Sequence, residues 1–352
     1  MTKMSKLPLW PYYTVFLIYA LISSFFVFLS SGLVIDNISY LHHFNNYVSA
    51  PIIFFYLAYI AIDNDKTKRN LFILVLICFI VLQLMMIIQE NMTVQFFKIS
   101  EHYEMAGRAS GLMVSPNKTA SLLVFLLPFY YYFYKHEHLN KILKYAFIVA
   151  LFLIPYIVLY SGSRGAMLSL VFVLVPLIII YKQFRLLGSL IFLLIISLPL
   201  FWDYLITDQF LYGYNRIFSS VGEYQGNDVA SGRIDIWYSA YKLLIENPLN
   251  LIVGFGLGAY YYYFPYANTE NFYLEVIMQL GMLGLILFVF FVSKFYKYID
   301  YCKKNYSYHF SKLFLLSCIS ILVTFLSQNM SGLFNLNVLI LGLGFAYMHN
   351  ST

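Results

Sequence analysis

The sequence contains few charged residues. Only 11% of its 352 residues are Asp, Glu, Lys or Arg, while 61% are hydrophobic. A soluble globular domain carries about 25% charged residues, so this chain has too few of them to cover a surface that faces water. The same shortage excludes basic nucleic-acid-binding patches and charged disordered tails. The composition therefore predicts an integral membrane protein that is embedded in a lipid bilayer.

Cysteines and cofactor-binding motifs are also scarce. The three cysteines, Cys78, Cys302 and Cys318, have no paired spacing, which excludes a disulfide framework and a CxxC metal site. The seven histidines include only two close pairs, and P-loop, GxGxxG, HExxH and GxSxG patterns in the right context are missing. We therefore expect no metal and no other cofactor.

Long uncharged runs are abundant. A helix needs about 20 apolar residues to cross the hydrocarbon core, because its backbone groups must be satisfied internally there. Ten candidate spans lie near 12–31, 46–62, 71–89, 119–134, 145–160, 165–181, 186–202, 271–293, 312–328 and 331–348. The predicted fold class is all-α, a polytopic transmembrane helical bundle of about ten spans that forms a single integral membrane domain over residues 1–352.

The basic residues indicate how the spans are oriented. With the N-terminus inside, 15 of the 22 Lys and Arg residues fall in cytoplasmic segments, and both termini are cytoplasmic. Two external segments, 90–118 and 203–270, are longer than a connection requires. Long loops in compact proteins are usually functional, so we expect the function to lie on the outer face.

The large external loop, 203–270, contains a predicted amphipathic helix over 231–247. Its apolar stripe consists of Ile234, Trp237, Tyr241, Leu244 and Ile245, which recur at helical spacing. Such a helix either lies on the outer membrane surface or caps the helical bundle.

Arginine is enriched over lysine in the predicted external segments. Four of the six arginines are predicted to be external, against three of the sixteen lysines. The external basic residues are Lys98, Arg108, Lys118, Arg164, Arg216, Arg233 and Lys242. Arginine binds phosphate through a planar fork of donors and keeps its charge, whereas lysine is a point charge. The set favours an external phosphate-bearing ligand, and the alternative is a set of ordinary ion pairs with external acids.

Two of these arginines stand out by position. Arg164 lies in the short hairpin 161–165 between two uncharged helices, beside the start of the next helix, where an anion is favoured. Arg233 lies in the first turn of the amphipathic helix, where a cation opposes the helix dipole unless an anion is bound. The alternatives are a snorkelling anchor for Arg164 and a simple pair with Asp228 or Asp235 for Arg233. Arg108 and Arg216 are weaker candidates of the same kind.

Glu270 is the candidate general base. It lies where the large loop meets the eighth span, and a carboxylate beside a desolvated cleft can accept a proton from a hydroxyl. The alternative is an acid that serves the helix dipole. Glu275, one turn later, is expected to face the bundle interior, as a structural residue or as part of the cleft. Gly281 and Gly284 are expected to let a neighbouring helix approach closely.

Four short motifs in order resemble the O-antigen ligase and polymerase superfamily. They are Gly107-Arg108 through Ser115-Pro116-Asn117, then Ser161 to Ala166, then Ser231-Gly232-Arg233 through Trp237 with Pro248, and finally Glu270-Asn271 followed by Gly281-x-x-Gly284. The resemblance covers roughly residues 107–294. It implies a donor that is an undecaprenyl-diphosphate-linked glycan, whose diphosphate is held by Arg164 and Arg233. Ligases of the family typically have His-Asn where this chain has Glu270-Asn271, and the carboxylate favours the polymerase branch.

The resemblance implies a metal-independent, inverting glycosyltransferase that polymerises lipid-linked repeat units into O antigen, capsule or exopolysaccharide at the inner or plasma membrane. Arg164, Arg233 and Glu270 are the expected catalytic residues, with Arg108, Arg216, Asn117, Asn271 and Tyr262 as substrate-binding candidates. A chain-length regulator and a flippase are candidate partners. The alternatives are a ligase that transfers polymer to a lipid A core or protein, a polysaccharide transporter or flippase, and a structural membrane scaffold.

Overall fold

The computed structural model describes residues 10–31, 65–91, 115–182, 233–257, 264, 269, 271–305, 308–326, 340–344 and 347. These residues form helices and no strand, which confirms the all-α prediction. Four described helical stretches are long and apolar enough to cross a membrane, namely Arg69–Ile88, Lys141–Tyr160, Arg164–Tyr181 and Phe272–Lys304. The predicted spans 46–62 and 186–202, and most of 331–348, lie outside the described residues, so the count of ten stays a prediction.

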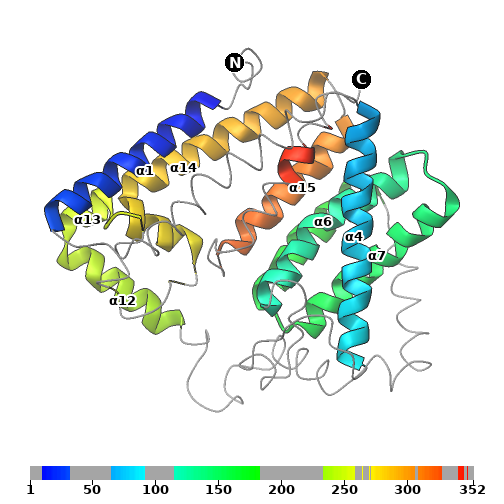
Figure 1. Cartoon of the computed structure of the whole chain (residues 1–352), viewed down its shortest axis with the longest axis horizontal. Coiled ribbons are helices and arrows are strands. Elements are labelled where there is room, and N and C mark those ends of the chain that lie inside the picture. Colours follow the sequence, from blue (N-terminus) through cyan, green and yellow to red (C-terminus); the bar gives the residue numbers. More distant parts are fainter. Residues whose placement is uncertain are drawn as a thin grey trace. The chain divides into compact units, whose positions relative to one another are not determined.

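The chain divides into two compact units (Figure 1). Unit 1 consists of Met1–Asp63, Val221–Ser307 and Phe325–Thr352, and unit 2 of Asn64–Ser220 and Tyr308–Thr324. Each unit therefore combines segments that are far apart in the sequence.

Unit 2 is built around one enclosed helix. It contains α4 (Asp65–Asn91), α6 (Pro116–His136), α7 (Lys141–Tyr160), α8 (Arg164–Tyr181) and α15 (Tyr308–Thr324). Helix α6 packs against α7, α8 and α15, and most of its side chains are buried. Aromatic rings fill its surroundings, with Phe129 contacting Phe72 of α4 at 5.0 Å and Phe310 of α15 at 6.0 Å between ring centroids. Such offset and edge-to-face ring pairs add to the burial of apolar area.

Hydroxyl groups tie the helices of unit 2 to one another. The Tyr130 hydroxyl donates to the Leu76 carbonyl at 3.0 Å, and the Ser169 hydroxyl donates to the Ser320 carbonyl at 2.7 Å. The Thr324 hydroxyl lies 3.3 Å from that of Ser169. Small hydroxyl residues allow close helix approach and satisfy polar groups where water is absent.

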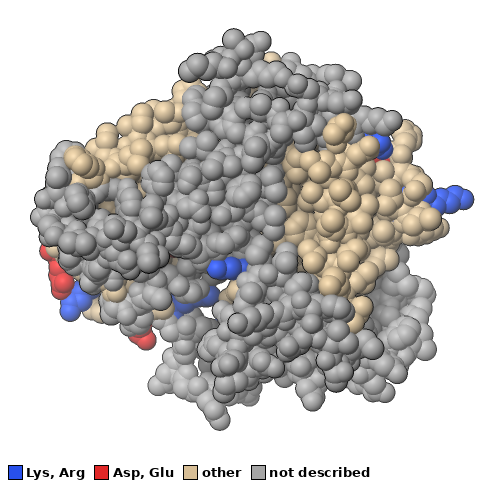
Figure 2. Space-filling view, viewed as in Figure 1, with Lys and Arg blue, Asp and Glu red and all other residues tan. Residues whose placement is uncertain are grey.

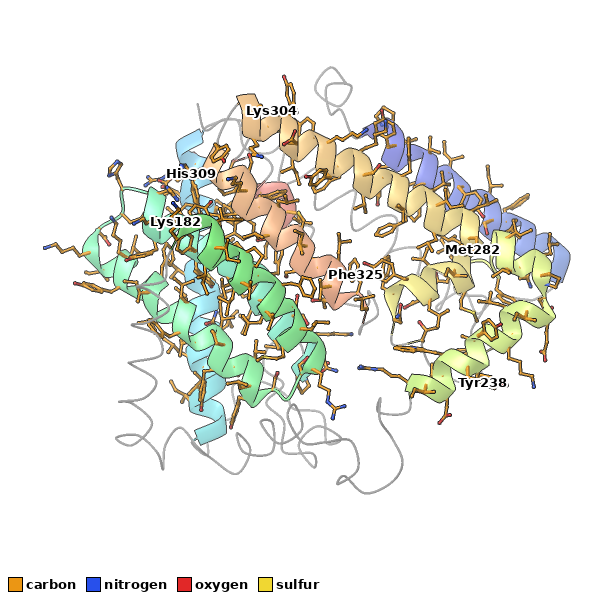
Figure 3. The ribbon with its side chains drawn as sticks, turned by 180° about the vertical axis from the view of Figure 1, so that it is seen from behind. Lys182, Tyr238, Met282, Lys304, His309 and Phe325 are labelled. Carbon is orange, nitrogen blue, oxygen red and sulfur yellow. The ribbon has the colours of Figure 1, made fainter. Side chains whose placement is uncertain are left out.

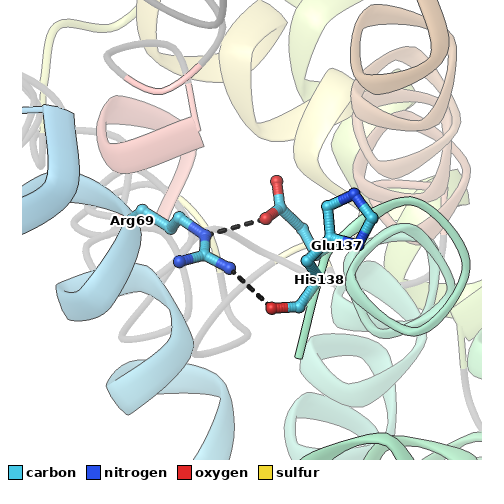
Figure 4. Close-up of polar contacts among 3 residues, drawn as sticks. All are labelled: Arg69, Glu137 and His138. Carbon is cyan, nitrogen blue, oxygen red and sulfur yellow. Dashed lines mark hydrogen bonds and ion pairs between the residues drawn. The ribbon is translucent and has the colours of Figure 1, made fainter. Parts of the chain in front are cut away.

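The helix ends of unit 2 separate the basic residues into two groups. At one end Arg69 Nε donates to Glu137 Oε2 at 2.7 Å and Arg69 Nη2 to the His138 carbonyl at 3.4 Å (Figure 4). The imidazoles of His136 and His309 stack at the same end, with centroids 4.4 Å apart. The basic residues of this end are Arg69, Lys135, Lys141, Lys144, Lys182 and Lys312. The starts of α6 and α8, which carry Lys118 and Arg164, lie at the opposite end.

Unit 1 contains α1 (Trp10–Ser31), α12 (Arg233–Glu246), α13 (Pro248–Val253) and α14 (Phe272–Asn305). Helix α1 packs along the later part of α14, where Tyr12 meets Phe290 and Phe16 meets Phe288. The Lys294 ammonium lies 5.0 Å from the centroid of the Tyr12 ring, an arrangement that attracts the cation to the ring face.

Helix α14 is broken at Gly281, whose backbone angles are φ 67° and ψ −173°. The break exposes carbonyls that a continuous helix would bond internally. Two of these carbonyls are satisfied by main-chain N–H groups of the segment just after α13. Phe255 N donates to Met278 O at 2.8 Å, and Gly256 N donates to Gln279 O at 2.9 Å. The predicted span 271–293 is thus two helical segments rather than one continuous helix.

The two helical segments meet α13 through glycines. A Cβ atom on Gly281 would overlap the backbone of Ile252 and Val253, and one on Gly254 would overlap the backbone of Gln279 and Leu280. This confirms the predicted close approach at Gly281. At Gly284 the three nearest atoms belong to Leu280 of the same helix, so the approach of a neighbouring helix there stays a prediction.

Helix α12 is present where the sequence predicted it, and the residues of its predicted apolar stripe are divided between two sides of the helix. Leu244 is buried as expected, and Ala240 joins it against Phe255, Phe264 and Met278. The other predicted stripe residues Ile234, Tyr241 and Ile245 are 54%, 59% and 52% exposed. The reason is that α12 is apolar on two sides, and spacing alone does not distinguish the side that packs on α14.

Candidate functional site

The first candidate site is the hairpin that joins α7 to α8. Gly162 turns the chain with φ 62°, and buried Ser161 donates from its hydroxyl to the Val158 carbonyl at 2.8 Å. Ser163 caps α8, because its hydroxyl accepts from Ala166 N at 3.3 Å. These bonds use the two serines within the hairpin itself. Arg164, the first residue of α8, is exposed, so the hairpin presents its one charge outward.

Asn117 lies at the same end of unit 2 as Arg164. Both residues are in the first turn of their helices, and α6 and α8 run side by side in the same direction. Asn117 is half-buried, and its carbonyl accepts from the Ser121 hydroxyl at 2.8 Å. The positive ends of the α6 and α8 dipoles therefore lie at the end of unit 2 that carries Arg164, together with the negative ends of α4, α7 and α15, so an anion is favoured only directly beside the two helix starts.

The second candidate site begins at Arg233 in unit 1. Arg233 is seven residues before Ala240 and eleven before Leu244, so it lies on the side of α12 that packs on α14. It is half-buried, while the polar residues Asp235, Lys242 and Glu246 occupy another side. Asp228 lies outside the described residues, so both predictions for Arg233, a pair with Asp228 or Asp235 and a role at a bound anion, stay predictions.

Trp237 joins α12 to the start of α14. Its indole Nε1 donates to the Thr269 carbonyl at 2.9 Å, and the Thr269 hydroxyl donates to the Asn271 carbonyl at 2.8 Å. Thr269 is fully buried. Trp237 is one helical turn after Arg233, so the segment that leads into α14 is fixed close to the start of α12. The sequence placed Trp237 in an apolar stripe and did not reveal this contact, since nothing in helical spacing identifies the acceptor of an indole N–H.

Asn271 is the N-cap of α14. Its Oδ1 accepts from Leu274 N at 3.1 Å, and its Nδ2 donates to the Leu326 carbonyl at 3.2 Å. Phe272 N also donates to the Phe325 carbonyl at 3.0 Å. The side chain that the sequence proposed for substrate binding thus holds two segments of unit 1 together, and its contact with a substrate stays a prediction.

Glu275 faces the interior of unit 1, as predicted. It is 2% exposed, and its Oε1 accepts from Gln279 Nε2 at 3.0 Å, with Gln279 itself 1% exposed. Both residues lie on the helical segment of α14 that precedes Gly281. Among the described residues Glu275 is the one buried side chain that carries a charge. Buried acids in membrane helices commonly mark functional positions.

The remaining candidates fall outside the part of the chain that the structure describes. They are Glu270, Arg108, Arg216 and Tyr262. Glu270 is flanked by Thr269 and Asn271, which are both placed. The structure groups Arg164 with Asn117 in unit 2 and Arg233 with Trp237, Thr269 and Asn271 in unit 1. No cluster of three or more potential metal ligands occurs among the described residues.

These observations define a helical membrane protein with charged residues at a few helix starts. Residues 147–289 match the family model described as O-Antigen ligase, and this stretch includes Arg164, Arg233 and Asn271. The match agrees with the resemblance to the O-antigen ligase and polymerase superfamily, and the chain fits membrane enzymes of that type. No curated protein matches the chain.

Proposed function

We propose that this chain is a membrane glycosyltransferase that polymerises undecaprenyl-diphosphate-linked oligosaccharide repeat units on the external face of the bacterial inner or plasma membrane. The observation that carries the proposal is the position of two arginines within the family-matched stretch. Arg164 is presented at the start of α8, and Arg233 begins α12 on its α14-facing side. Both positions suit an anion, because helix N-termini and guanidinium groups both favour phosphate.

In the proposed reaction, an acceptor hydroxyl oxygen forms a bond to the anomeric carbon of the donor, and the bond from that carbon to the diphosphate oxygen breaks. The hydroxyl proton passes to the carboxylate of Glu270. Arg164 and Arg233 stabilise the negative charge that develops on the leaving undecaprenyl diphosphate, which makes a metal unnecessary. Attack from the face opposite the leaving group inverts the anomeric carbon.

The charge distribution of unit 2 supports the proposed orientation. The end that collects Arg69, Lys135, Lys141 and Lys182 would be cytoplasmic, and the end with Arg164 would be external. The proposal also places both chain termini in the cytoplasm and the diphosphate site in the compartment in which polymer is assembled. A chain-length regulator and a flippase are the partners that this placement suggests.

A ligase that transfers finished polymer to a lipid A core or protein acceptor is the second candidate. It is favoured by the description of the matching family model. The carboxylate at position 270, where ligases of the superfamily typically have histidine, is the reason to prefer a polymerase. A transporter is less well supported, because the described helices carry one buried charged side chain, Glu275, rather than a line of charges at mid-depth.

The test is the gel profile of surface polysaccharide from a deletion strain complemented with variants. Loss of a polymerase leaves lipid that carries a single repeat, whereas loss of a ligase leaves no polymer on the acceptor. Arg164→Ala, Arg233→Ala and Glu270→Gln should each reduce polymer by at least about a hundredfold, since each removes stabilisation of the transition state or its base. Arg164→Lys should retain part of the activity, because it keeps the charge but not the fork of donors.

Matched controls lie on the same helices. Lys182→Ala at the end of α8 and Lys242→Ala on the polar side of α12 remove a cation without touching the proposed site. Lys242 pairs with Glu246 at 3.8 Å on the surface, an interaction of little energetic value. Full-length polymer from normally expressed Arg164→Ala and Glu270→Gln variants would exclude the proposed mechanism.

A further inference from the structure

Helix α12 has three distinct sides. One side packs on α14 through Ala240 and Leu244, and a second carries the charged residues Asp235, Lys242 and Glu246. The third side is apolar and exposed. It consists of Ile234, Tyr238, Tyr241 and Ile245, which are 54%, 67%, 59% and 52% exposed. Their spacing of four, three and four residues places them in one narrow stripe, which we name the α12 stripe.

Helices α13 and α1 of unit 1 also expose apolar side chains. On α13, Leu249 and Ile252 are 70% and 51% exposed. The Val253 carbonyl, next to Ile252, accepts from the Ser23 hydroxyl of α1 at 2.8 Å. At this level α1 exposes Ile22 and Phe25. Exposed apolar side chains therefore occur on α1 and α13 as well as in the α12 stripe.

The direction of α12 also differs from that of the spans it contacts. Figure 1 shows α12 and the segment of α14 before Gly281 running across the direction of α1 and of the later part of α14. Tyr238 is labelled on α12 and Met282 on α14 just beyond the break (Figure 3). If α1 and the later part of α14 cross the bilayer, then α12 lies along its surface.

The charged residues of α12 also suit a helix that lies along the bilayer surface. In Figure 2 charged atoms gather at the lower left, over α12. On α12 the charged side lies beside the stripe, and both lie away from the packed side. A helix at a bilayer surface needs this arrangement, with one side on the protein, one in lipid and one in water. Tyrosine suits such a boundary because its ring is apolar and its hydroxyl is polar.

We propose that α12 and α13 form an interfacial arm whose apolar stripe is embedded in the headgroup and acyl boundary of the lipid bilayer. The occupant of this surface is lipid rather than a second copy of the chain, because the stripe lies between a side of α12 that packs on the protein and a side that carries charge, on a helix that runs across the direction of α1 (Figure 1). For the proposed function, on which this last point rests, the arm holds Arg233 at the depth of lipid headgroups, where the diphosphate of a lipid-linked donor emerges.

The proposal is tested with single-cysteine variants of the full chain, reconstituted in nanodiscs. The background replaces Cys78, Cys302 and Cys318 with alanine. Tyr238→Cys and Ile245→Cys report on the stripe, and Glu246→Cys and Lys242→Cys report on the charged side of the same helix. Each cysteine receives an environment-sensitive fluorophore, and quenching is measured with nitroxide-labelled phosphatidylcholine in the bilayer and with iodide in the water. The readout does not require enzymatic activity, so it is independent of the proposed function.

Fluorophores at positions 238 and 245 should show blue-shifted emission. Nitroxide-labelled lipid should quench most of this emission, and iodide should quench little of it. Fluorophores at positions 242 and 246 should show no blue shift, strong quenching by iodide and little quenching by nitroxide-labelled lipid. Two results overturn the proposal. Strong iodide quenching at 238 and 245 would place the stripe in water. Blue-shifted emission that resists lipid quenching, and that changes when each nanodisc holds a single chain, would show that a second copy covers it.

Discussion

At the residue scale, the hydrogen bond between Trp237 and Thr269 holds the parts of the second candidate site together. The indole N–H fixes the carbonyl of the residue that precedes Glu270 in the sequence, while Arg233 lies one turn earlier on the same helix. Catalytic groups need to be held within a fraction of an ångström, so such a bond matters more for rate than for folding. Trp237 is then a positioning residue of the proposed reaction.

Trp237→Phe should keep the ring and remove the bond. Loss of one hydrogen bond, about 1 kcal/mol, corresponds to about a fivefold slower reaction when it is felt in the transition state. We expect shorter polymer at an unchanged protein level, measured by gel and by immunoblot. Trp237→His, which retains a ring N–H, should recover part of the length.

The neighbouring Tyr238→Phe is the matched control, since the Tyr238 side chain is 67% exposed. Polymer from this variant should be of normal length. Equal shortening in Trp237→Phe and Tyr238→Phe would contradict the positioning role, and so would a normal length in both.

At the element scale, the broken α14 depends on Gly281. Its φ of 67° with ψ near 180° is a conformation that glycine adopts readily and other residues rarely do. A Cβ atom there would also overlap the backbone of Ile252. Backbone cannot move aside as the end of a flexible side chain can.

Gly281→Ala should therefore lower the free energy of unfolding by at least about 2 kcal/mol, seen as a lower melting temperature of the purified protein in detergent. Ser293→Ala on the same helix is the control, because Ser293 is exposed and bonds within its own turn to the Phe290 carbonyl. A Gly281→Ala protein as stable as Ser293→Ala would mean that the break is not required.

Several elements were predictable from the sequence, because uncharged runs bounded by charge define helices in lipid. The runs near 71–89, 145–160 and 165–181 all appear as helices, and so does 231–247. The break at Gly281 was not predictable, because a glycine within a long apolar run is equally consistent with a continuous helix that packs closely on a neighbour. The sequence left open which side of α12 packs on the protein, since exposed Ile234 and Tyr241 are as apolar as buried Ala240.

The candidate site was predicted only as separate positions. The sequence identified Arg164, Arg233 and Asn271, and it placed the first two correctly at helix starts. It did not indicate that Asn271 caps α14 and bonds to Leu326, because that contact joins residues 55 positions apart. Contacts of this range depend on tertiary packing that local spacing does not encode.

At the scale of the whole molecule, the stacked imidazoles of His136 and His309 make stability depend on pH. Burial is the main cause that lowers the pKa of His136 below its usual 6.5, with smaller effects of His309 and Lys135 in the same direction, while Glu137 opposes them. The unfolded chain binds a proton more readily than the folded one. Stability is therefore full above about pH 6.5 and is lost as the pH falls through the lowered pKa of the folded state.

The melting temperature of the purified protein should thus fall between about pH 8 and about pH 5.5, and His136→Phe, which keeps a ring in the stack, should reduce that fall. His138→Phe is the matched control, because His138 is exposed at the same helix end. A pH dependence that is identical in the wild type and in His136→Phe would assign the effect to other groups.

The carbonyls at the Gly281 break imply an order of assembly. Met278 and Gln279 rely on N–H groups of Phe255 and Gly256, and Leu280 relies on the hydroxyl of Tyr19 at 2.8 Å. An unsatisfied carbonyl in hydrocarbon costs several kcal/mol, so the early segment of α14 is a poor independent insertion unit. During biosynthesis this segment should therefore take its place at the bilayer boundary together with the arm that precedes it and against α1, so that backbone groups of three segments far apart in the sequence are satisfied in a single step.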